Sequence, residues 1–327
     1  MLEHGGNLGV AARQYGLPVE HWLDLSTGIN PHGYPIPEIP ATLWQCLPQN
    51  DDALQAAAAG YYGTPHLLAA AGTQALLQTL PRLRAPCRIA IAAPTYAEHP
   101  KAWTAAGHQV TRYPPEHASA MVANTDVLLL CHPNNPTGQR YRAEELLAWQ
   151  EELASRGGWL VVDEAFLDAT PEHSLAPHIG QPGLIVLRSL GKFFGLAGAR
   201  VGFLLAWPEL LTMAEEMLGP WPIGGPARLV ATRALNDTHW QRDTRQRLQL
   251  DASRLAAMLT RQGLAPAGDT ALFQWVSTLH APELHEALAR QGILTRPFTE
   301  PASLRFGLPA TELEWARLET ALQQITG

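Results

Sequence analysis

The chain has 327 residues, of which 46% are hydrophobic and 16% charged, so it is long enough to fold as one large α/β domain plus a smaller one. A formal net charge of −7 argues against a nucleic-acid surface, which needs clustered Lys and Arg. The three cysteines (Cys46, Cys87 and Cys131) are too few and too far apart for a disulfide framework or a structural zinc site, and neither a signal peptide nor a membrane-spanning run is present, so we expect a cytoplasmic protein with no metal and no membrane partner.

The first two thirds of the chain divide into an arm and a large domain. Residues 1–40, rich in Gly, Pro and Asn, are predicted to form an N-terminal arm with a short helix at 8–15. Residues 41–215 alternate between helix and strand patterns. The predicted helices are 51–59 (ending at Gly60), 73–83, 95–106 and 142–156, and the predicted strands are 88–92, 108–113, 126–131, 159–163, 184–188 and 200–206. These strands are rich in Val, Ile and Leu with little polar alternation, which predicts a mostly parallel sheet with helices on both faces.

Residues 216–327 are predicted to form a small domain, with which the arm packs. Long helical patterns run through about 227–259, and a strand is predicted at 272–277. A final helix opens at Thr311, where Thr-Glu-Leu-Glu matches a capping box. Its apolar residues Leu318, Leu322 and Ile325 share one face.

A glycine-rich segment that follows the strand at 184–188 carries Lys192. It reads Ser-Leu-Gly-Lys-Phe-Phe-Gly-Leu-Ala-Gly-Ala-Arg-Val-Gly over residues 189–202. A lysine just past a buried strand can be desolvated, which lowers the pKa of the amine and makes it a nucleophile toward an aldehyde. Ser189 and Arg200 supply donors suited to a phosphate. An isolated Gly-Lys pair is usually a surface turn, but the whole segment with the partners below favours a cofactor site.

Asp163 stands at the carboxyl end of the apolar strand 159–163, where open α/β sheets bind ligands. A buried carboxylate needs a cationic partner, which a protonated pyridine nitrogen would supply. The ring could then accept electrons from a substrate carbon. The alternative for a lone Asp at this position is a helix cap.

Three further residues or pairs occupy positions where a cofactor could be contacted. Gly72 and Thr73 open a predicted helix, whose amides and dipole suit a phosphate. Asn135, in the His-Pro-Asn-Asn-Pro-Thr-Gly segment over 132–138, could donate to a phenolate oxygen, although such a segment alone is ordinary turn chemistry. Tyr96 could lie flat against a ring, or it could be a core aromatic.

In this order, these segments resemble the fold-type I pyridoxal-phosphate enzymes, the aspartate aminotransferase superfamily. The segment around Lys192 is similar at every specified position to the attachment-site pattern of class-I aminotransferases, and the resemblance covers nearly the whole chain. It implies an α/β fold with a large, mostly parallel sheet and a small α/β domain, and a homodimer. It also implies that Lys192 forms a Schiff base with pyridoxal 5′-phosphate, that Asp163 pairs with the pyridine nitrogen, and that Asn135 contacts the phenolate oxygen. The residues implied around the cofactor phosphate are Gly72, Thr73, Ser189 and Arg200.

The substrate is suggested by segments near both ends of the chain. Arg305, in Ser-Leu-Arg-Phe-Gly over 303–307, looks like the family's carboxylate-binding arginine, with a surface ion pair as the alternative. Arg296 stands where members with phosphorylated substrates bind that phosphate. His4, in His-Gly-Gly-Asn, and the segment 23–31 resemble the threonine-phosphate decarboxylase branch. That branch implies His4 at the substrate phosphate and places Gly28 and Asn135 at the substrate.

Two positions depart from the usual pattern of the superfamily. Phe166 follows Asp-Glu-Ala where aminotransferases usually have Tyr, so a hydroxyl that would donate to the cofactor is absent. Leu47, in Cys-Leu-Pro, stands where relatives often carry a Tyr that reaches the neighbouring subunit's cofactor phosphate. The homodimer remains the expectation, but that contact cannot form.

The resemblance implies decarboxylation of O-phospho-L-threonine to (R)-1-amino-2-propanol O-phosphate, a building block for cobalamin, with Lys192 returning a proton to Cα. A histidinol-phosphate aminotransferase would use the same arginines and stays open. A sensing domain of a transcription regulator ranks low, because such regulators carry a DNA-binding module ahead of this fold. The roughly seventy residues before the phosphate loop contain no basic helix pair.

Overall fold

The computed structural model describes residues 4–49 and 53–326. Packing divides them into two compact units. The larger unit contains residues 33–49, 53–135 and 140–243, and the smaller unit contains residues 4–32, 136–139 and 244–326. No helix within these ranges is long and apolar enough to cross a membrane.

Seven strands form the sheet of the larger unit, in the order β2-β8-β7-β6-β5-β3-β4. They are β2 (Leu67–Ala70), β3 (Arg88–Ala92), β4 (Gln109–Tyr113), β5 (Val127–Cys131), β6 (Trp159–Asp163), β7 (Leu184–Ser189) and β8 (Gly202–Leu205). β8 is antiparallel to both of its neighbours and all other pairs are parallel. The mostly parallel sheet is therefore confirmed. β2 was not predicted, because Leu-Leu-Ala-Ala lacks the β-branched and aromatic residues that mark strands.

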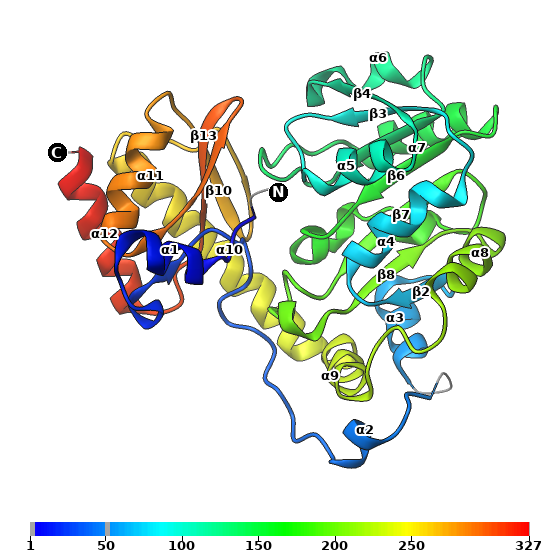
Figure 1. Ribbon diagram of the computed structural model, residues 1–327, viewed down its shortest axis with the longest axis horizontal. Helices are drawn as coiled ribbons and strands as arrows, with labels where there is room; N and C mark the ends of the chain where they lie inside the picture. The colour runs from blue at the N-terminus through cyan, green and yellow to red at the C-terminus, as the bar shows by residue number, and fades with distance from the viewer. Residues whose placement is uncertain (1–3, 50–52, 327) are drawn as a thin grey trace. The chain divides into compact units, whose positions relative to one another are not determined.

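Helices cover the sheet of the larger unit (Figure 1). The helices of this unit are α2 (Thr42–Gln45), α3 (Leu54–Tyr62), α4 (Thr73–Thr79), α5 (Glu98–Ala105), α6 (Ala118–Val122), α7 (Ala143–Ala154), α8 (Pro208–Leu218) and α9 (Gly225–Asn236). Of these, α2 lies away from the sheet and contacts α9. Helices α4, α5 and α8 pack in one core with alternate strand residues such as Val161 and Ile185. The intervening strand residues, such as Leu160 and Val162, are fully buried as well. Every residue of β5, β6 and β7 is buried, as expected for a sheet covered on both faces.

Several predicted helices in the larger unit have different ends in the structure. The helix predicted at 73–83 ends at Thr79, and a 3-10 turn follows at Leu80–Leu83. Two other helices differ at both ends. The first was placed at 51–59, where Asp51 and Asp52 lie outside the described residues. α3 runs through the predicted stop at Gly60 and ends at Gly63, which takes the left-handed conformation at φ 73°. The second begins at Glu98 and not at Thr95, because the Thr95 hydroxyl bonds to the Asn134 side chain instead of capping the helix.

The smaller unit contains the N-terminal arm and the C-terminal part of the chain. Its strands are β1 (Leu23–Asp24), β9 (Gly268–Thr270), β10 (Phe273–Ser277), β11 (Ile293–Leu294), β12 (Arg296–Thr299) and β13 (Ala302–Gly307), and its helices are α1 (Leu8–Tyr15), α11 (Ala281–Arg290) and α12 (Glu312–Thr326). β1 pairs with β11 in parallel, and the remaining strands form an antiparallel sheet in the order β12-β13-β10-β9. α1 has the predicted bounds. The capping box is confirmed, since Thr311 Oγ1 accepts from Glu314 N at 3.2 Å and Glu314 Oε2 accepts from Thr311 N at 3.0 Å.

The division between the units differs from the predicted boundary at residue 215. α8 and α9 belong to the larger unit, and the division falls inside α10 (Thr238–Arg261). α9 packs along α3, which keeps both helices with the sheet that α3 covers. The arm is also shorter than the predicted 1–40, since residues from Gly33 onward belong to the larger unit.

Single 3-10 turns lie at Val19–His21, Leu80–Leu83, Pro115–His117, Leu167–Ala169, Pro171–His173, Ala176–His178 and Ala197–Ala199.

Candidate active site

The carboxyl ends of β5, β6 and β7 meet at one edge of the larger unit's sheet, because parallel strands end together. A cavity of about 170 Å³ opens there. Seven of the predicted cofactor residues line it: Thr73, Tyr96, Asn135, Asp163, Ser189, Lys192 and Arg200. Gly72 precedes Thr73 and lies against Arg200, so the structure brings the whole predicted cofactor set together.

Lys192 lies in the loop between β7 and β8. Hydrogen bonds fold this loop tightly: Ser189 Oγ accepts from Gly191 N at 3.2 Å, and the Lys192 carbonyl accepts from Gly195 N at 3.1 Å. The Lys192 side chain is half-buried, and its Nζ lies 5.2 Å from the centre of the Phe166 ring. The amine is therefore held in the cavity beside an aromatic face and not in bulk water.

Asp163 has a partner that the sequence did not reveal. Its Oδ2 lies 2.9 Å from Nε2 of His99, and the two side chains are almost completely buried. Burial lowers the pKa of His99, but hydrogen bonds to Asp163 and Cys131 outweigh it and raise the pKa to about 10. His99 thus favours its protonated form beside Asp163, and the hydrogen bond holds the Asp163 side chain in place where it lines the cavity.

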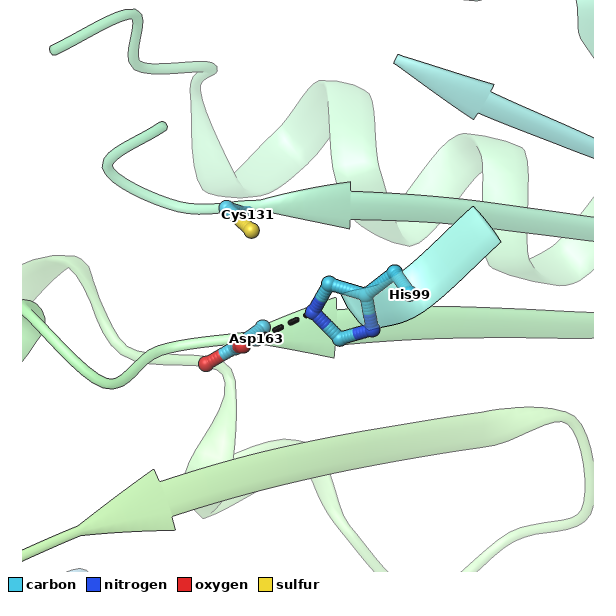
Figure 2. Close-up of side chains that lie close together, drawn as sticks. All are labelled: His99, Cys131 and Asp163. Atoms are coloured by element: carbon cyan, nitrogen blue, oxygen red, sulfur yellow. Dashed lines mark hydrogen bonds and ion pairs between the residues drawn. The ribbon is translucent and has the colours of Figure 1, made fainter. Parts of the chain in front are cut away.

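Figure 2 shows His99, Cys131 and Asp163 converging from α5, β5 and β6. Their ligand atoms lie within 4.8 Å of one another, a spacing that a metal ion could use. However, the His99 nitrogen that faces Asp163 forms the hydrogen bond, so a metal would have to displace a buried charged pair. The chemistry of the cluster suits proton holding better than metal binding.

A cradle of hydrogen-bond donors lies at the start of α4. Gly72 has φ 73°, and a Cβ there would lie 2.6 Å from Nη2 of Arg200. A Cβ on Gly202 would lie 2.6 Å from Thr73 N. Arg200 is itself in the left-handed region at φ 53°, a strain typical of functional sites. Two glycines and a strained arginine thus hold backbone amides, guanidinium and the Ser189 hydroxyl around a space that fits a phosphate.

The adjacent residues Asn134 and Asn135 have different structural roles. Asn134 is buried, donates to the Pro94 carbonyl at 2.9 Å, and accepts from the Thr95 hydroxyl at 3.1 Å. These bonds fix the loop after β5 to the turn before α5. Asn135 lines the cavity as a result. The sequence could not assign these roles, because both residues follow the same strand.

A buried ionic network fixes the loop that carries Phe166. Arg188 of β7 contacts the carboxylates of Glu164 and Asp168, and the three side chains are almost completely buried. Ser174 and the backbone of Leu175 also donate to Glu164. Because this loop spans Phe166, which lines the cavity, the network sets one wall of the site.

The predicted substrate residues lie in the smaller unit. His4 and Arg296 line a cavity of about 620 Å³ together with Ser26, His285 and Thr295. Arg305 lies directly opposite Arg296 in the β12–β13 pairing. Burial, then the charge of Arg296, lowers the pKa of Arg305 to about 9, although Asp24 raises it. Gly28 is buried at φ 60° and does not line this cavity.

Sequence reasoning did not identify Gln74, Cys131 or His285 at these cavities, or His99, which is buried behind Asp163. Cys131 and Gln74 each adjoin a segment that had been identified, at the end of β5 and the start of α4. His99 lies three residues after Tyr96, but Tyr96 precedes α5, so helical spacing did not link the two residues. No sequence pattern marks His285, which reaches its cavity only through the packing of α11.

Comparison with protein families, with known sequences and with solved structures finds similarity over most of the chain in each case. The aminotransferase class I and II family matches residues 22–325. A threonine-phosphate decarboxylase of Pseudomonas aeruginosa is 53% identical over 98% of this chain and 97% of its own, and one from a Sinorhizobium species is 42% identical over 99% and 98%. A histidinol-phosphate aminotransferase of Sinorhizobium meliloti, solved with pyridoxal 5′-phosphate, has a TM-score of 0.84 at 20% identity, covering 100% of this chain and 98% of that one.

Proposed function

The chain belongs to the aminotransferase class I and II family, and from this premise we propose that it uses pyridoxal 5′-phosphate to decarboxylate O-phospho-L-threonine. The observation that carries the proposal is the pair of facing arginines, Arg296 and Arg305. Like charges directly opposite on neighbouring strands are destabilising. A substrate with two anionic groups removes that repulsion, and O-phospho-L-threonine carries a phosphate and a carboxylate.

The cavity of the larger unit fits this cofactor. We propose that Lys192 holds it covalently, that Gly72, Thr73, Ser189 and Arg200 bind its phosphate, and that Tyr96, Asn135 and Asp163 contact its ring. When bound, the cofactor supplies an electron-withdrawing ring for the electrons that the departing carboxylate leaves on Cα. The His99–Asp163 pair keeps a carboxylate ready for the ring nitrogen.

Residues of the chain bind the substrate and move its proton. Arg296 and His4 bind the phosphate, and Arg305 binds the carboxylate. Gly28, at φ 60°, shapes the backbone of the arm just after Ser26. Binding at both ends would limit rotation about Cα and fix the direction of the carboxylate, which would leave as CO₂ while the bound cofactor accepts the electrons. Lys192 then donates a proton to Cα, which yields (R)-1-amino-2-propanol O-phosphate.

A histidinol-phosphate aminotransferase is the second candidate, because it would use the same two arginines. His4 favours the decarboxylase, since it lines the cavity with Arg296. The relatives that align over the full chain and are named for decarboxylation favour it too.

The experiment that separates the two functions measures CO₂ release from O-phospho-L-threonine by the holoenzyme. Stoichiometric CO₂ and aminopropanol phosphate support the proposal. Keto-acid formation from histidinol phosphate with 2-oxoglutarate turnover, and no CO₂ from O-phospho-L-threonine, would overturn it.

We also propose a cytoplasmic homodimer that supplies cobalamin synthesis. Large apolar side chains on and after α2 support a partner surface, because Trp44 is 69% and Leu47 60% exposed. Ultracentrifugation tests the assembly, and a monomer at micromolar concentration would contradict it.

A further inference from the structure

Ser26, just past β1, joins two parts of the smaller unit that the proposed function uses separately. It is 1% exposed. Its hydroxyl accepts from Gly6 N at 2.7 Å and donates to Asp24 Oδ1 at 2.5 Å. Its carbonyl accepts from Nη2 of Arg305 at 2.6 Å. One buried residue therefore contacts both the glycine pair that follows His4 and the guanidinium that binds the carboxylate.

The backbone of the arm lies directly against Ser26. A Cβ on Gly5 would lie 2.3 Å from the Ser26 carbonyl oxygen, the same atom that receives Arg305. Gly6 has φ 81°, a conformation that side chains rarely adopt. The two glycines after His4 are thus required by this close approach, and they fix where the arm leaves Ser26.

The segment that carries Ser26 is held on both sides. Leu25 N donates to the Leu294 carbonyl at 2.8 Å, two residues before Arg296. Gly307 N donates to the Leu25 carbonyl at 2.7 Å, two residues after Arg305. The position of Ser26 is therefore fixed relative to both arginine-bearing strands. Its hydroxyl then bonds the arm to this fixed position.

We propose that Ser26 is a positioning residue that couples recognition of the substrate phosphate to recognition of its carboxylate. This inference rests on the proposed function. The hydroxyl holds the His4 arm at the cavity that Arg296 lines, and the carbonyl orients Arg305. A Ser26→Ala change removes the first contact and keeps the second, so it should weaken phosphate binding and spare the carboxylate end.

The test compares the wild-type and Ser26→Ala holoenzymes. We expect KM for O-phospho-L-threonine to rise about tenfold, because losing one hydrogen bond to a buried group typically weakens binding by about that factor. We expect kcat to change less than about threefold. Calorimetry should show the same loss of affinity for inorganic phosphate and no loss for L-threonine. Ser253→Ala is the control, because its exposed hydroxyl bonds only to a carbonyl within α10.

A double variant distinguishes positioning from general structural support. If Ser26 acts through the arm, His4→Ala combined with Ser26→Ala binds phosphate no more weakly than His4→Ala alone. Additive losses would overturn the inference. If Ser26→Ala does not fold, Gly6→Ala loosens the arm from its other side and must show the same non-additivity with His4→Ala.

The two hypotheses fail in different ways. A wild-type holoenzyme that releases no CO₂ from O-phospho-L-threonine overturns the proposed function. Equal phosphate affinity of the wild-type and Ser26→Ala proteins overturns the coupling, whatever the reaction is.

Discussion

Lys192 is one of only two lysines in the chain. The other, Lys101, lies on α5 with 56% of its side chain exposed and pairs with Glu98. Lys192, in contrast, is half-buried and lies in a cavity beside an aromatic ring. At the scale of single residues, Lys192 is therefore the lysine that we propose for the covalent bond to the cofactor.

Changing Lys192 to Ala should abolish the visible absorbance of the bound cofactor and stop CO₂ release. Borohydride reduction followed by peptide mass mapping should label residue 192 in the wild type and nothing in the variant. Lys101→Ala is the matched control and should keep both the spectrum and the label. A label on Lys101 in the wild type would refute the assignment.

His99 should make the stability of the cofactor-free protein depend on pH. Its pKa is about 10 in the folded chain and 6.5 in the reference state. A raised pKa contributes stability that is fully present below about pH 6.5 and is lost as the pH rises toward 10. Replacing His99 with Phe leaves the Asp163 carboxylate buried without its cation, which costs about 3–5 kcal/mol at neutral pH.

Thermal unfolding from pH 6 to 10 measures this effect. The difference between wild type and His99→Phe should shrink as the pH rises. Asp163→Asn in the His99→Phe background should recover part of the loss. A pH-independent difference would show that the pair is not ionic.

At the scale of elements, one glycine that precedes a helix and one that lies inside a helix have different structural roles. Gly72 precedes α4 at φ 73°, and a Cβ there would collide with Arg200. Gly60 lies inside α3 and is exposed, and a Cβ added to it would meet no atom within 4 Å. A glycine pattern alone predicted a helix end at Gly60, where the true end is at Gly63.

The variants Gly72→Ala and Gly60→Ala should behave in opposite ways. Gly72→Ala should weaken cofactor binding at least tenfold, measured by fluorescence titration, because Arg200 must leave the phosphate cradle. Gly60→Ala should leave cofactor affinity unchanged and raise the free energy of unfolding by about 0.5–1 kcal/mol. Normal cofactor affinity in Gly72→Ala would contradict the cradle.

At the scale of the whole molecule, the two proposed binding cavities differ in chemistry, and each is lined by described residues of one unit. The cofactor cavity in the larger unit is lined by Lys192 and by Asp163, which His99 contacts from behind. The smaller unit's cavity adjoins two facing arginines and therefore favours an anionic ligand. Because the two cavities differ, the effect of the cofactor on thermal stability can be measured separately from the effect of a phosphate bound at the substrate cavity.

Inorganic phosphate should raise the thermal midpoint of the holoenzyme, in which the cofactor's own phosphate site is filled. A ligand that binds only the folded state at a hundred times its Kd adds about 2.7 kcal/mol. Arg296→Gln should lose most of this shift, and the exposed Arg242→Gln should keep it. An equal shift in all three proteins would contradict a phosphate site at Arg296.

The sequence by itself determined the fold class, because that depends on local patterns, and it predicted the candidate cofactor residues through the family resemblance of their segments. Buried parallel strands read as apolar runs, and their carboxyl ends carry Asp163 and Lys192 in recognisable segments. The capping box at Thr311 and the helix Leu8–Tyr15 were also predictable from neighbouring residues alone.

The tertiary structure decided what depends on residues far apart in the chain. The His99–Asp163 pair joins residues 64 positions apart, and Ser26 meets Arg305 across 279. The division within α10 followed from the packing of α9 on α3, which no local pattern encodes. A sequence specifies such contacts only through the whole fold, because strand order and register bring their residues together.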